Sequence, residues 1–449
     1  GYSQVQSEGY GNADQSLSMI SMAYDMNPAL PVYDADGNYT FRNNLSSSTG
    51  VYGGNPVATA RKADMQNRQN RFTGNIYTDL KFLGDDRLVF RTQFGVDDIF
   101  SMDRMFLPND LAVSVDGPGK GNVATFNTKT WVWENTLTYK NTWGKHNLSA
   151  MVGQTAQKFT QTVFRLGVKN FEDNRLGYHD LSVGKDVWLN QTTDSEWAML
   201  SYISRIHYSF DNRYLFTFTG RVDGSSKFGA NHKYGFFPSG AFAWRISEEK
   251  FWEPMRNWWD NAKVRFSYGS LGNQQVSNYY YIETISTGQL GYTFNGTDKA
   301  NYASASNPIS DGLTWETVVT YNLGFDLGFL KNRLNVTADL YIRDTKDMLT
   351  TSLTLPDVFG APSPKENCAD LRTKGYEITV SWRDRHMVAG KPFSYGISAS
   401  LGDYKSKITK YKNDDMLLTD HYVGETLGEL WGYRTDGLFK TDEEAARYQ

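Results

Sequence analysis

The sequence is poor in cysteine, in long hydrophobic runs and in excess positive charge. Its single cysteine, Cys368, excludes an internal disulfide and a zinc site built from cysteines. No apolar run approaches the roughly 18 residues that a membrane-spanning helix needs, and the mean hydropathy is −0.55. The net charge of −4 lacks the basic excess that is typical of nucleic-acid-binding proteins. These absences exclude a disulfide scaffold and a helical membrane protein, and they argue against a nucleic-acid partner.

Aromatic residues and glycines are plentiful. Aromatics make up 15% of the 449 residues, and 40 residues are glycine. Aromatic side chains favour strands and glycine favours turns, so this composition is typical of many strands separated by turns. The length allows either several ordinary domains or one very large all-β domain.

The stretch from Glu196 to Val222 has the most regular pattern in the chain. Its even positions, on both sides of a break at 211–213, are mostly apolar, and its odd positions are mostly polar. The even positions are Ala198, Leu200, Tyr202, Ser204, Ile206, Tyr208, Phe210, Tyr214, Phe216, Phe218 and Val222. Side chains alternate between the faces of a strand, so the pattern predicts a hairpin with one apolar and one polar face.

The polar face of this hairpin includes charged residues such as Arg205 and Arg221. A packed soluble core disfavours such charges. A sheet whose apolar side meets lipid and whose polar side meets a wet lumen accounts for both faces. The fold class predicted is therefore all-β, as part of a large antiparallel transmembrane β-barrel.

The same alternation recurs along the chain and predicts about twelve strands in all. The other predicted strands are 73–82, 88–100, 128–141, 147–166, 242–246, 262–268, 315–329, 334–342, 376–382 and 393–401. We expect one barrel domain over 1–449, with an irregular, loop-rich entry (1–70), regular strands (71–403) and a loop-rich end (404–449).

Connections between the predicted strands alternate between short and long. Short links are expected at 83–87, 142–146, 211–213 and 331–333, with a longer one at 248–260 that contains a helical turn before Pro254. Long loops are expected at 101–127, 167–195, 223–237, 270–314 and 345–373. Short turns at one rim and long loops at the other are typical of outer-membrane barrels.

Several short motifs, in a fixed order, resemble the SusC/RagA family of TonB-dependent outer-membrane transporters. They are Asp223-Gly224-Ser225-Ser226-Lys227-Phe228-Gly229, Tyr234–Ser239, Trp244–Glu249, Val264–Gly269 with Gly272-Asn273-Gln274, Leu313–Glu316, Asp339–Leu349, Lys374–Glu377 and Gly432–Phe439. Each motif alone is weak, but eight blocks in the family's order from 223 to 439 make the resemblance specific.

The resemblance implies a plugged barrel of about twenty-two strands that imports large nutrients with energy relayed by TonB. It also implies a SusD-like lipoprotein that covers the extracellular mouth. We expect the chain to be a piece of the barrel truncated at both ends, because no plug domain, TonB-contact segment or signal peptide is recognisable. Outer-membrane lipid is then a further partner, and the bacterial outer membrane the location.

Aromatic residues in the predicted extracellular loops are the candidate contacts to substrate or to the lipoprotein lid. They are Trp188, Tyr279, Tyr280, Tyr281 and Tyr292. Aromatic faces suit sugar rings and peptide side chains, and they suit packing against a partner protein equally well. The residues Asp223, Gly224, Ser225, Phe228 and Gly229 form the family's signature loop, for which an architectural role is favoured over contact with plug, lid or substrate.

No catalytic, metal or cofactor site is predicted. Asp34–Asn38 is interpreted as a turn and not a calcium loop, because no closing acidic ligand follows. His207 and His232 have no third ligand at metal spacing. The acidic run Asp442–Glu444 is expected on a solvated face or in the first turn of a short helix.

The function that we favour at this point is TonB-dependent import of glycan oligomers or peptides, with no enzyme activity. Two alternatives stay open: a passive porin-like barrel, and a soluble extracellular β-protein that binds or cleaves polysaccharide with paired carboxylates.

Overall fold

The structure is a computed structural model of the chain. It describes residues 1–8, 23–24, 30–40, 55–84, 86–111, 119–293, 299–305, 308–309, 312–351, 358, 363–413, 420–435, 437 and 439–447.

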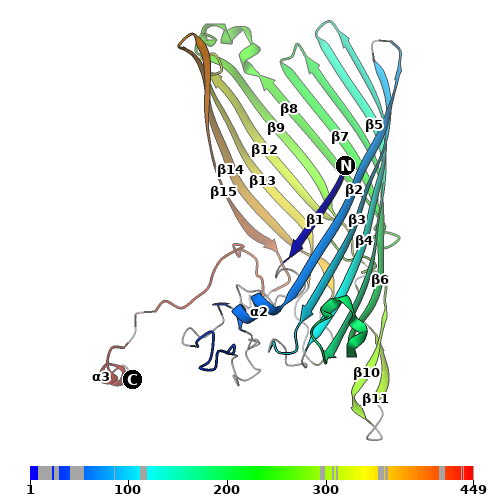
Figure 1. Cartoon of the computed structure of the whole chain (residues 1–449). Coiled ribbons are helices and arrows are strands. Elements are labelled where there is room, and N and C mark those ends of the chain that lie inside the picture. The colour runs from blue at the N-terminus through cyan, green and yellow to red at the C-terminus, as the bar shows by residue number, and fades with distance from the viewer. Residues whose placement is uncertain are drawn as a thin grey trace.

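One antiparallel sheet of thirteen strands dominates the fold (Figure 1). Its strands, in spatial order, are β1 (Tyr2–Glu8), β2 (Asp64–Phe82), β3 (Leu88–Leu107), β4 (Lys120–Trp143), β5 (His146–Phe171), β6 (Gly184–Phe210), β7 (Tyr214–Ser225), β8 (Tyr234–Arg245), β9 (Trp259–Asn273), β12 (Glu316–Phe329), β13 (Leu334–Thr351), β14 (Lys365–Val388) and β15 (Lys391–Lys410). Strands β10 (Ile285–Thr293) and β11 (Lys299–Ala305) form a separate two-stranded sheet. The large sheet curves into an open wall with β1 and β15 at its edges (Figure 1).

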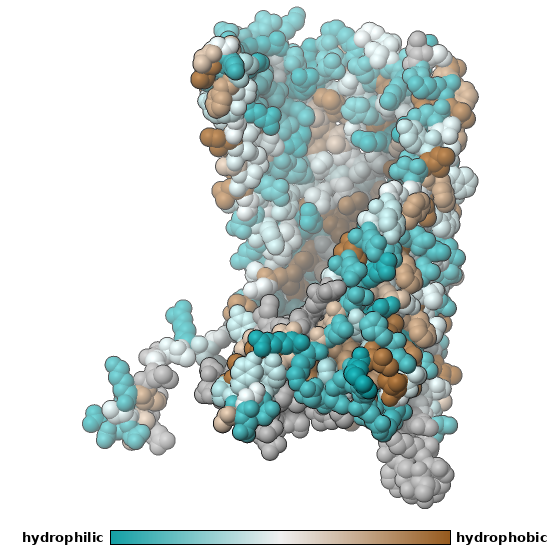
Figure 2. Space-filling view, viewed as in Figure 1, coloured by the Kyte–Doolittle hydropathy of each residue, from teal (hydrophilic) through white to brown (hydrophobic). Residues whose placement is uncertain are grey.

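The register of this sheet places apolar side chains in rows on one face. One such row crosses eight strands from β5 to β14: Leu148, Tyr208, Phe216, Phe242, Phe266, Leu323, Leu340 and Tyr376. Phe266 is 50% exposed and Leu340 is 51% exposed, as expected for side chains on an uncovered face. Hydrophilic residues gather at the upper and lower ends of the wall, and most of the hydrophobic patches lie between these ends (Figure 2). The predicted all-β barrel sheet with one continuous apolar face is confirmed.

The opposite face holds charges in networks that cross several strands. Arg265 on β9 donates to both carboxylate oxygens of Asp326 on β12, at 2.9 and 3.1 Å, and reaches Asp339 on β13 at 3.2 Å. Asn322 donates to Asp339 at 2.7 Å. Because these groups are paired and partly exposed, this face suits water rather than hydrocarbon.

The two rims of the sheet differ, as predicted. Short links at 83–87, 144–145, 211–213, 330–333 and 389–390 lie at one rim, the upper one in Figure 1. Asp211 and Asn212 have φ of 54° and 53°, the left-handed pair that a tight hairpin turn requires. The predicted helical turn between β8 and β9 is present as two 3₁₀ segments, Ile246–Glu248 and Lys250–Met255, although Pro254 lies inside the second instead of ending it.

The strands are longer than predicted, and the loops correspondingly shorter. Regular pairing begins at Asp64 and continues to Lys410, beyond the predicted limits of 71 and 403, and β1 adds seven residues within the expected irregular entry. The link predicted at 223–237 covers only 226–233, and the loop predicted at 167–195 covers only 172–183. Backbone hydrogen bonding continues beyond the apolar band, where the side chains no longer alternate and the sequence pattern is lost.

The buried core is small and lies at the long-loop rim. One cluster joins helix α2 (Pro56–Lys62) to the end of β3, and a second joins β3, β5 and the 3₁₀ segments Gly177–His179 and Leu181–Val183. Helix α3 (Asp442–Arg447) carries the acidic run in its first turn, as predicted. Within the described residues, no helix is long and apolar enough to span a membrane.

Candidate functional site

The signature loop between β7 and β8 contributes a fully buried aromatic side chain to the long-loop rim. Phe228 is 0% exposed, and its ring centroid lies 5.0 Å from that of Trp315. Five buried side chains, from here on the rim cluster, pack together: Phe228, Phe237, Val276, Leu313 and Trp315. Such burial is typical of an architectural element, the role favoured for this loop from the sequence.

The first residues of the signature motif lie in β7, not in a loop as predicted. Asp223 is buried and accepts hydrogen bonds from Arg221 Nε at 2.7 and 2.8 Å, which fix its carboxylate against the strand. Gly224 lies under the ring of Tyr234, where a Cβ atom would come within 2.3 Å of Cε1. A side chain at 224 therefore fits only if the exposed ring of Tyr234 moves aside.

Lys227 links this loop to the connection that follows β9. Its Nζ donates to the carbonyl of Val276 at 3.0 Å and lies 5.6 Å from the ring centroid of Trp197. Burial lowers the pKa of Lys227. The carbonyl and the aromatic face compensate part of the cost of holding this ammonium group away from water.

The connection over residues 274–284, from here on the strap, is tied to strands on both sides. Asn278 donates to Ser195 Oγ of β6 at 2.6 Å, and the hydroxyl of Tyr279 accepts the N–H of Glu196 at 3.2 Å. The hydroxyl of Tyr280 accepts the N–H of Lys365, the first residue of β14, at 2.8 Å. Two adjacent tyrosines therefore join β6 to β14, between which the sheet order places β7, β8, β9, β12 and β13.

Tyr279 takes a strained conformation at the centre of the strap. Its φ of 62° lies in the left-handed region, which a bulky residue occupies at a cost of about 1–3 kcal/mol. Its neighbour Ile282 donates its N–H to the carbonyl of Tyr279 at 2.9 Å, which closes a turn there. The turn directs the hydroxyl group of Tyr279 toward β6 and that of Tyr280 toward β14.

The strap leads into the β10–β11 hairpin, which extends below the lower rim of the sheet in Figure 1. Tyr292, predicted in a loop, is part of β10. The sequence did not predict this hairpin, whose two strands pair with each other and form a sheet of their own.

Trp188 is also in a strand, β6, and not in the predicted loop. Its ring covers Gly167 of β5, where a Cβ atom would lie 2.6 Å from Cε2, and the Nζ of Lys120 lies 5.5 Å from the ring centroid. Trp188 precedes Glu196 by eight positions on β6, about 26 Å at 3.3 Å per residue. The structure thus brings the signature loop and Tyr279, Tyr280 and Tyr281 together and leaves Trp188 apart from them.

Two further residues complete the rim, of which the sequence analysis missed Asn367. The amide of Asn367 on β14 accepts the N–H of Thr314 at 2.9 Å and donates to the carbonyl of Thr314 at 3.0 Å. The indole of Trp315 donates to the carbonyl of Lys233 at 3.0 Å. The Leu313–Glu316 motif pointed to Trp315, whereas nothing in the sequence marks Asn367.

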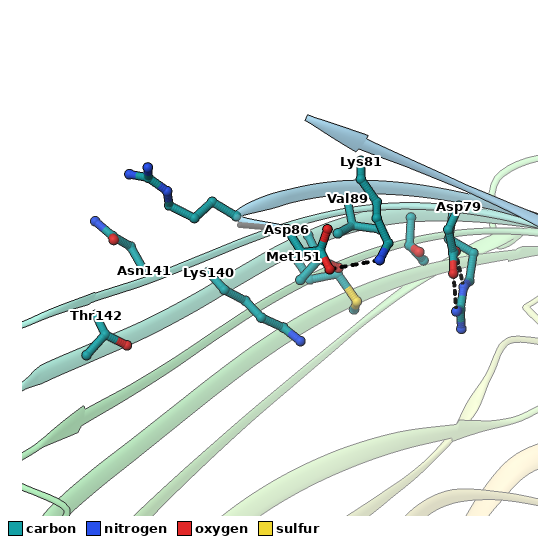
Figure 3. A pocket seen from close by; sticks show the side chains of 12 residues that line it. Asp79, Lys81, Asp86, Val89, Lys140, Asn141, Thr142 and Met151 are labelled. Atoms are coloured by element: carbon teal, nitrogen blue, oxygen red, sulfur yellow. Dashed lines mark hydrogen bonds and ion pairs between the residues drawn. The ribbon is translucent and has the colours of Figure 1, made fainter. Parts of the chain in front are cut away.

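The other rim holds charged groups that neutralise one another. A cavity of about 880 Å³ on the polar face of β2–β5 is lined by charged and hydroxyl side chains (Figure 3). Arg91 donates to both oxygens of Asp79 at 2.6 and 2.7 Å, and Lys81 pairs with Asp86 at 2.8 Å. Most of the charge that lines this cavity is therefore already paired.

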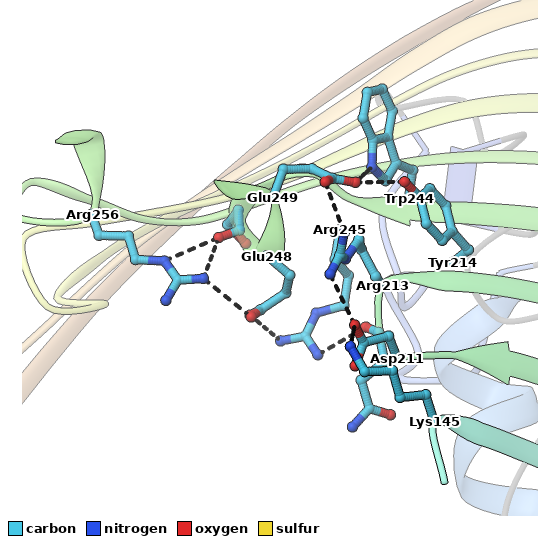
Figure 4. A network of polar contacts seen from close by, with 11 residues as sticks. Lys145, Asp211, Arg213, Tyr214, Trp244, Arg245, Glu248, Glu249 and Arg256 are labelled. Carbon is cyan, nitrogen blue, oxygen red and sulfur yellow. Dashed lines mark hydrogen bonds and ion pairs between the residues drawn. The ribbon is translucent and has the colours of Figure 1, made fainter. Parts of the chain in front are cut away.

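A second network at this rim ties β7 and β8 to the link that follows them (Figure 4). Glu249 accepts hydrogen bonds from the hydroxyl of Tyr214 at 2.6 Å, the indole of Trp244 at 3.1 Å and the guanidinium of Arg213 at 2.9 Å. The Tyr214 hydroxyl and these other donors lower the pKa of Glu249. This network stabilises the folded rim as long as Glu249 is ionised.

Among the described residues, no group of three or more histidine, cysteine, aspartate and glutamate side chains could hold a metal ion. Asp34 Oδ1 accepts the N–H groups of Asp36 and Asn38 at 3.0 and 2.8 Å, so this segment forms the predicted turn. His207 Nδ1 lies 2.9 Å from the hydroxyl of Thr217, on the polar face of β6.

Comparisons with known proteins find a matching family model and several relatives. The family model described as TonB dependent receptor-like, beta-barrel matches residues 10–436. TonB-dependent receptor P3 of Formosa agariphila is 32% identical over 453 residues, which cover 97% of this chain and 43% of that protein. TonB-dependent receptor SusC of Bacteroides thetaiotaomicron is 28% identical and covers 90% of this chain and 41% of that protein.

The fold agrees with a solved structure as well. The structure of the RagAB peptide transporter superposes with a TM-score of 0.71 at 24% identity, over 85% of this chain and 41% of that one. The chain spans less than half the length of the curated relatives that it matches. On the family match and the identity to receptor P3, this chain belongs to the β-barrel family of TonB-dependent receptors and lies in the outer membrane.

Proposed function

We propose that the chain is the barrel part of a SusC-like importer that takes up large nutrients, either glycan oligomers or peptides, with energy relayed by TonB. The match of the family model to residues 10–436 carries the proposal. The names of the relatives support it, since all are called TonB-dependent receptors and one is SusC. The mechanism is energy-coupled movement of a plug inside the barrel, with no bond chemistry and no catalytic residue.

A SusD-like lipoprotein at the long-loop rim is the partner that we propose. The rim cluster and the strap give this rim a firm base, and the β10–β11 hairpin projects from it (Figure 1). A rigid base holds a projecting arm in a defined direction, which lowers the entropy lost when a partner docks. The TonB complex is proposed to act on a part of the full-length protein other than this barrel segment.

Within this proposal the aromatic residues of the long-loop rim have different roles. The hydroxyl groups of Tyr279 and Tyr280 accept backbone N–H groups, so these two side chains position the strap. Trp188 is 41% exposed and presents a ring that can stack on a sugar or a peptide side chain. Tyr281 and Tyr292 remain proposed contacts to substrate or lid.

Uptake by the native host tests the proposal. A strain that lacks the gene should fail to grow on one class of oligomer, glycan or peptide, and should recover with the full-length gene. Depletion of TonB should abolish the same uptake, because a plugged barrel opens only with energy. Uptake that persists at the wild-type rate without TonB would favour a passive, porin-like barrel instead.

A single-residue comparison tests the aromatic contact. Replacement Trp188→Ala should raise the substrate concentration needed for half-maximal uptake several-fold, because stacking on an aromatic ring contributes about 0.5–1.5 kcal/mol. Trp143, 45% exposed at the opposite rim, provides the matched control Trp143→Ala, for which uptake should not change. Equal effects of the two replacements would remove Trp188 from the site.

A further inference from the structure

Basic side chains gather on the outward face of β13, β14 and β15, near their long-loop ends. Lys374 lies directly opposite Lys405, and Arg372 lies directly opposite Lys407. The register puts Lys374 beside Ile342, in line with the apolar rows. These cations therefore share a face with the apolar side chains, not with the polar lumen.

Four lysines on this face lack a hydrogen-bonded counter-ion among the described residues. Arg372 is held by Asp344, with hydrogen bonds of 2.6 and 2.8 Å to its two oxygens. Four exposed lysines, from here on the lysine patch, surround this pair: Lys346, Lys374, Lys405 and Lys407. Their ammonium groups make no ion pair or hydrogen bond with a described residue, and Lys346 and Lys374 share with Arg372 the electrostatic attraction of Asp344. Asp403 lies two residues before Lys405 on the same face, opposite Tyr376, and accepts the N–H of Tyr404 at 2.8 Å. The four lysines and Arg372 exceed the two carboxylates, Asp344 and Asp403, so the patch keeps an excess of positive charge.

Such an arrangement is unfavourable without a counter-ion. Like charges directly opposite one another across two strands repel and destabilise the sheet. On the outward face of β4 and β5 each lysine has a carboxylate partner: Lys129 lies 3.8 Å from Asp98, and Lys158 lies 2.9 Å from Glu196. This excess of positive charge occurs in a chain whose net charge is −4, so the patch is not part of a general basic surface.

The height of the patch on the wall matches the boundary of the membrane. The outward row that contains Trp382 marks the short-turn end of the apolar face on β14, and Lys374 follows eight residues away. Eight residues cover about 26 Å along a strand, or about 20 Å of height at a tilt of about 40°, and the ten residues to the row of Arg372 and Lys407 cover about 25 Å of height. The apolar band of such barrels is about 25 Å tall, so the lysine patch lies at its upper boundary, where the head groups begin on the side of the long, extracellular loops.

We propose that the lysine patch binds the phosphate groups of an anionic, phosphorylated lipid in the outward-facing leaflet. The ammonium groups are at the height of the head group, and apolar side chains below them are open to its acyl chains. Ile378 is 37% exposed and Leu401 is 64% exposed, and they lie opposite each other on the same face. The site goes beyond nutrient import and depends only on the position of the chain in the membrane.

Titration of the full-length protein in detergent with diphosphoryl lipid A, followed by native mass spectrometry, tests the site. The fourfold lysine-to-glutamine variant (K346Q, K374Q, K405Q, K407Q) should bind this lipid at least about tenfold more weakly, because each basic residue near an anionic surface contributes roughly a fivefold factor. Dephosphorylated lipid A should bind wild type and variant equally. The double variant K129Q, K158Q is the matched control and should bind as wild type does.

Three results would overturn the proposal. The first is that wild type and the fourfold variant bind diphosphoryl lipid A with equal affinity. The second is that wild type binds the dephosphorylated and the diphosphoryl lipid with equal affinity, and the third is that millimolar inorganic phosphate displaces the lipid completely. Heat-dependent gel mobility checks that each variant is folded. If the fourfold variant does not fold, the double variant K374Q, K405Q replaces it, and its affinity for diphosphoryl lipid A should be at least about fivefold lower than that of wild type. Lipid binding is measured without transport, so failure here and failure of the import proposal are separate outcomes.

Discussion

Truncation of Phe228 should release the strap from the rim while the barrel wall stays intact. Phe228 is fully buried in the rim cluster and packs on Trp315 at 5.0 Å between ring centroids. A buried Phe→Ala replacement costs about 3–5 kcal/mol from lost burial and the cavity that remains. The cluster includes Val276, a residue of the strap, so the cost falls on the contacts that hold the strap.

Hydrogen exchange of the full-length protein, read in peptides that cover 274–284, measures this effect. Each 1.4 kcal/mol is a factor of ten, so protection in the strap should fall by about a hundredfold to a thousandfold in Phe228→Ala. Peptides from the middle of β12, such as 320–327, should exchange as in wild type, because backbone pairing on both sides protects that strand.

Phe236 supplies the matched control. It lies on β8 close to the same cluster in sequence, yet it is 61% exposed. Phe236→Ala should leave exchange in the strap unchanged. If Phe228→Ala leaves the strap protected, or if both variants loosen it equally, the rim cluster does not hold the strap and this reasoning is wrong.

Three further predictions address the two rims. Tyr280→Phe removes the hydroxyl that accepts the N–H of Lys365, and exchange at Lys365 should rise about fivefold to tenfold for a lost hydrogen bond worth about 1 kcal/mol. Gly224→Ala places a Cβ atom within 2.3 Å of the ring of Tyr234, so thermal stability should drop; an unchanged melting temperature would show that the ring moves freely. The pKa of Glu249 is lowered in the folded protein, so its contribution is present above the pKa of an unfolded glutamate and is lost as the pH falls below about 4. Glu249→Gln should therefore be less stable than wild type at pH 7 and lose less stability between pH 5 and pH 3, measured by thermal denaturation at each pH.

The strands that face lipid could be predicted from the sequence because the membrane imposes the pattern. Between Tyr321 and Leu327, alternate side chains must be apolar on one side and polar on the other, and the alternation is visible in the residues. The same reasoning predicted the hairpin of β6 and β7, with its turn at 211–213.

The ends of the strands could not be predicted in this way. Beyond the apolar band the pairing of β3 with β4 continues from Ser101 to Leu107, where both faces are in contact with water or with loops. Hydrogen bonds between backbones do not depend on side-chain type there, so the sequence carries no alternation to read. This is why Trp188 and Asp223 were expected in loops and lie in strands.

The rim was predicted in part. The motif over 223–229 indicated an architectural loop, and this role stays a prediction; the structure adds that Phe228 is buried. The links made by Asn278 and Asn367 join residues far apart in the chain, and no local pattern of composition or spacing marks them. Contacts of this kind depend on the curvature of the whole sheet.

The central claim is that one face of the sheet meets acyl chains and the other meets water, and spin labels on β12 test it most directly. In the full-length protein with Cys368→Ser, labels at single cysteines from 319 to 327 are placed in bilayers, and their collisions with oxygen and with a water-soluble nickel complex are measured. Labels at 321, 323, 325 and 327 should meet oxygen and be shielded from nickel, and labels at 322, 324 and 326 should show the reverse. Equal accessibility along the strand, or nickel contact at 323 with oxygen contact at 322, would contradict the account.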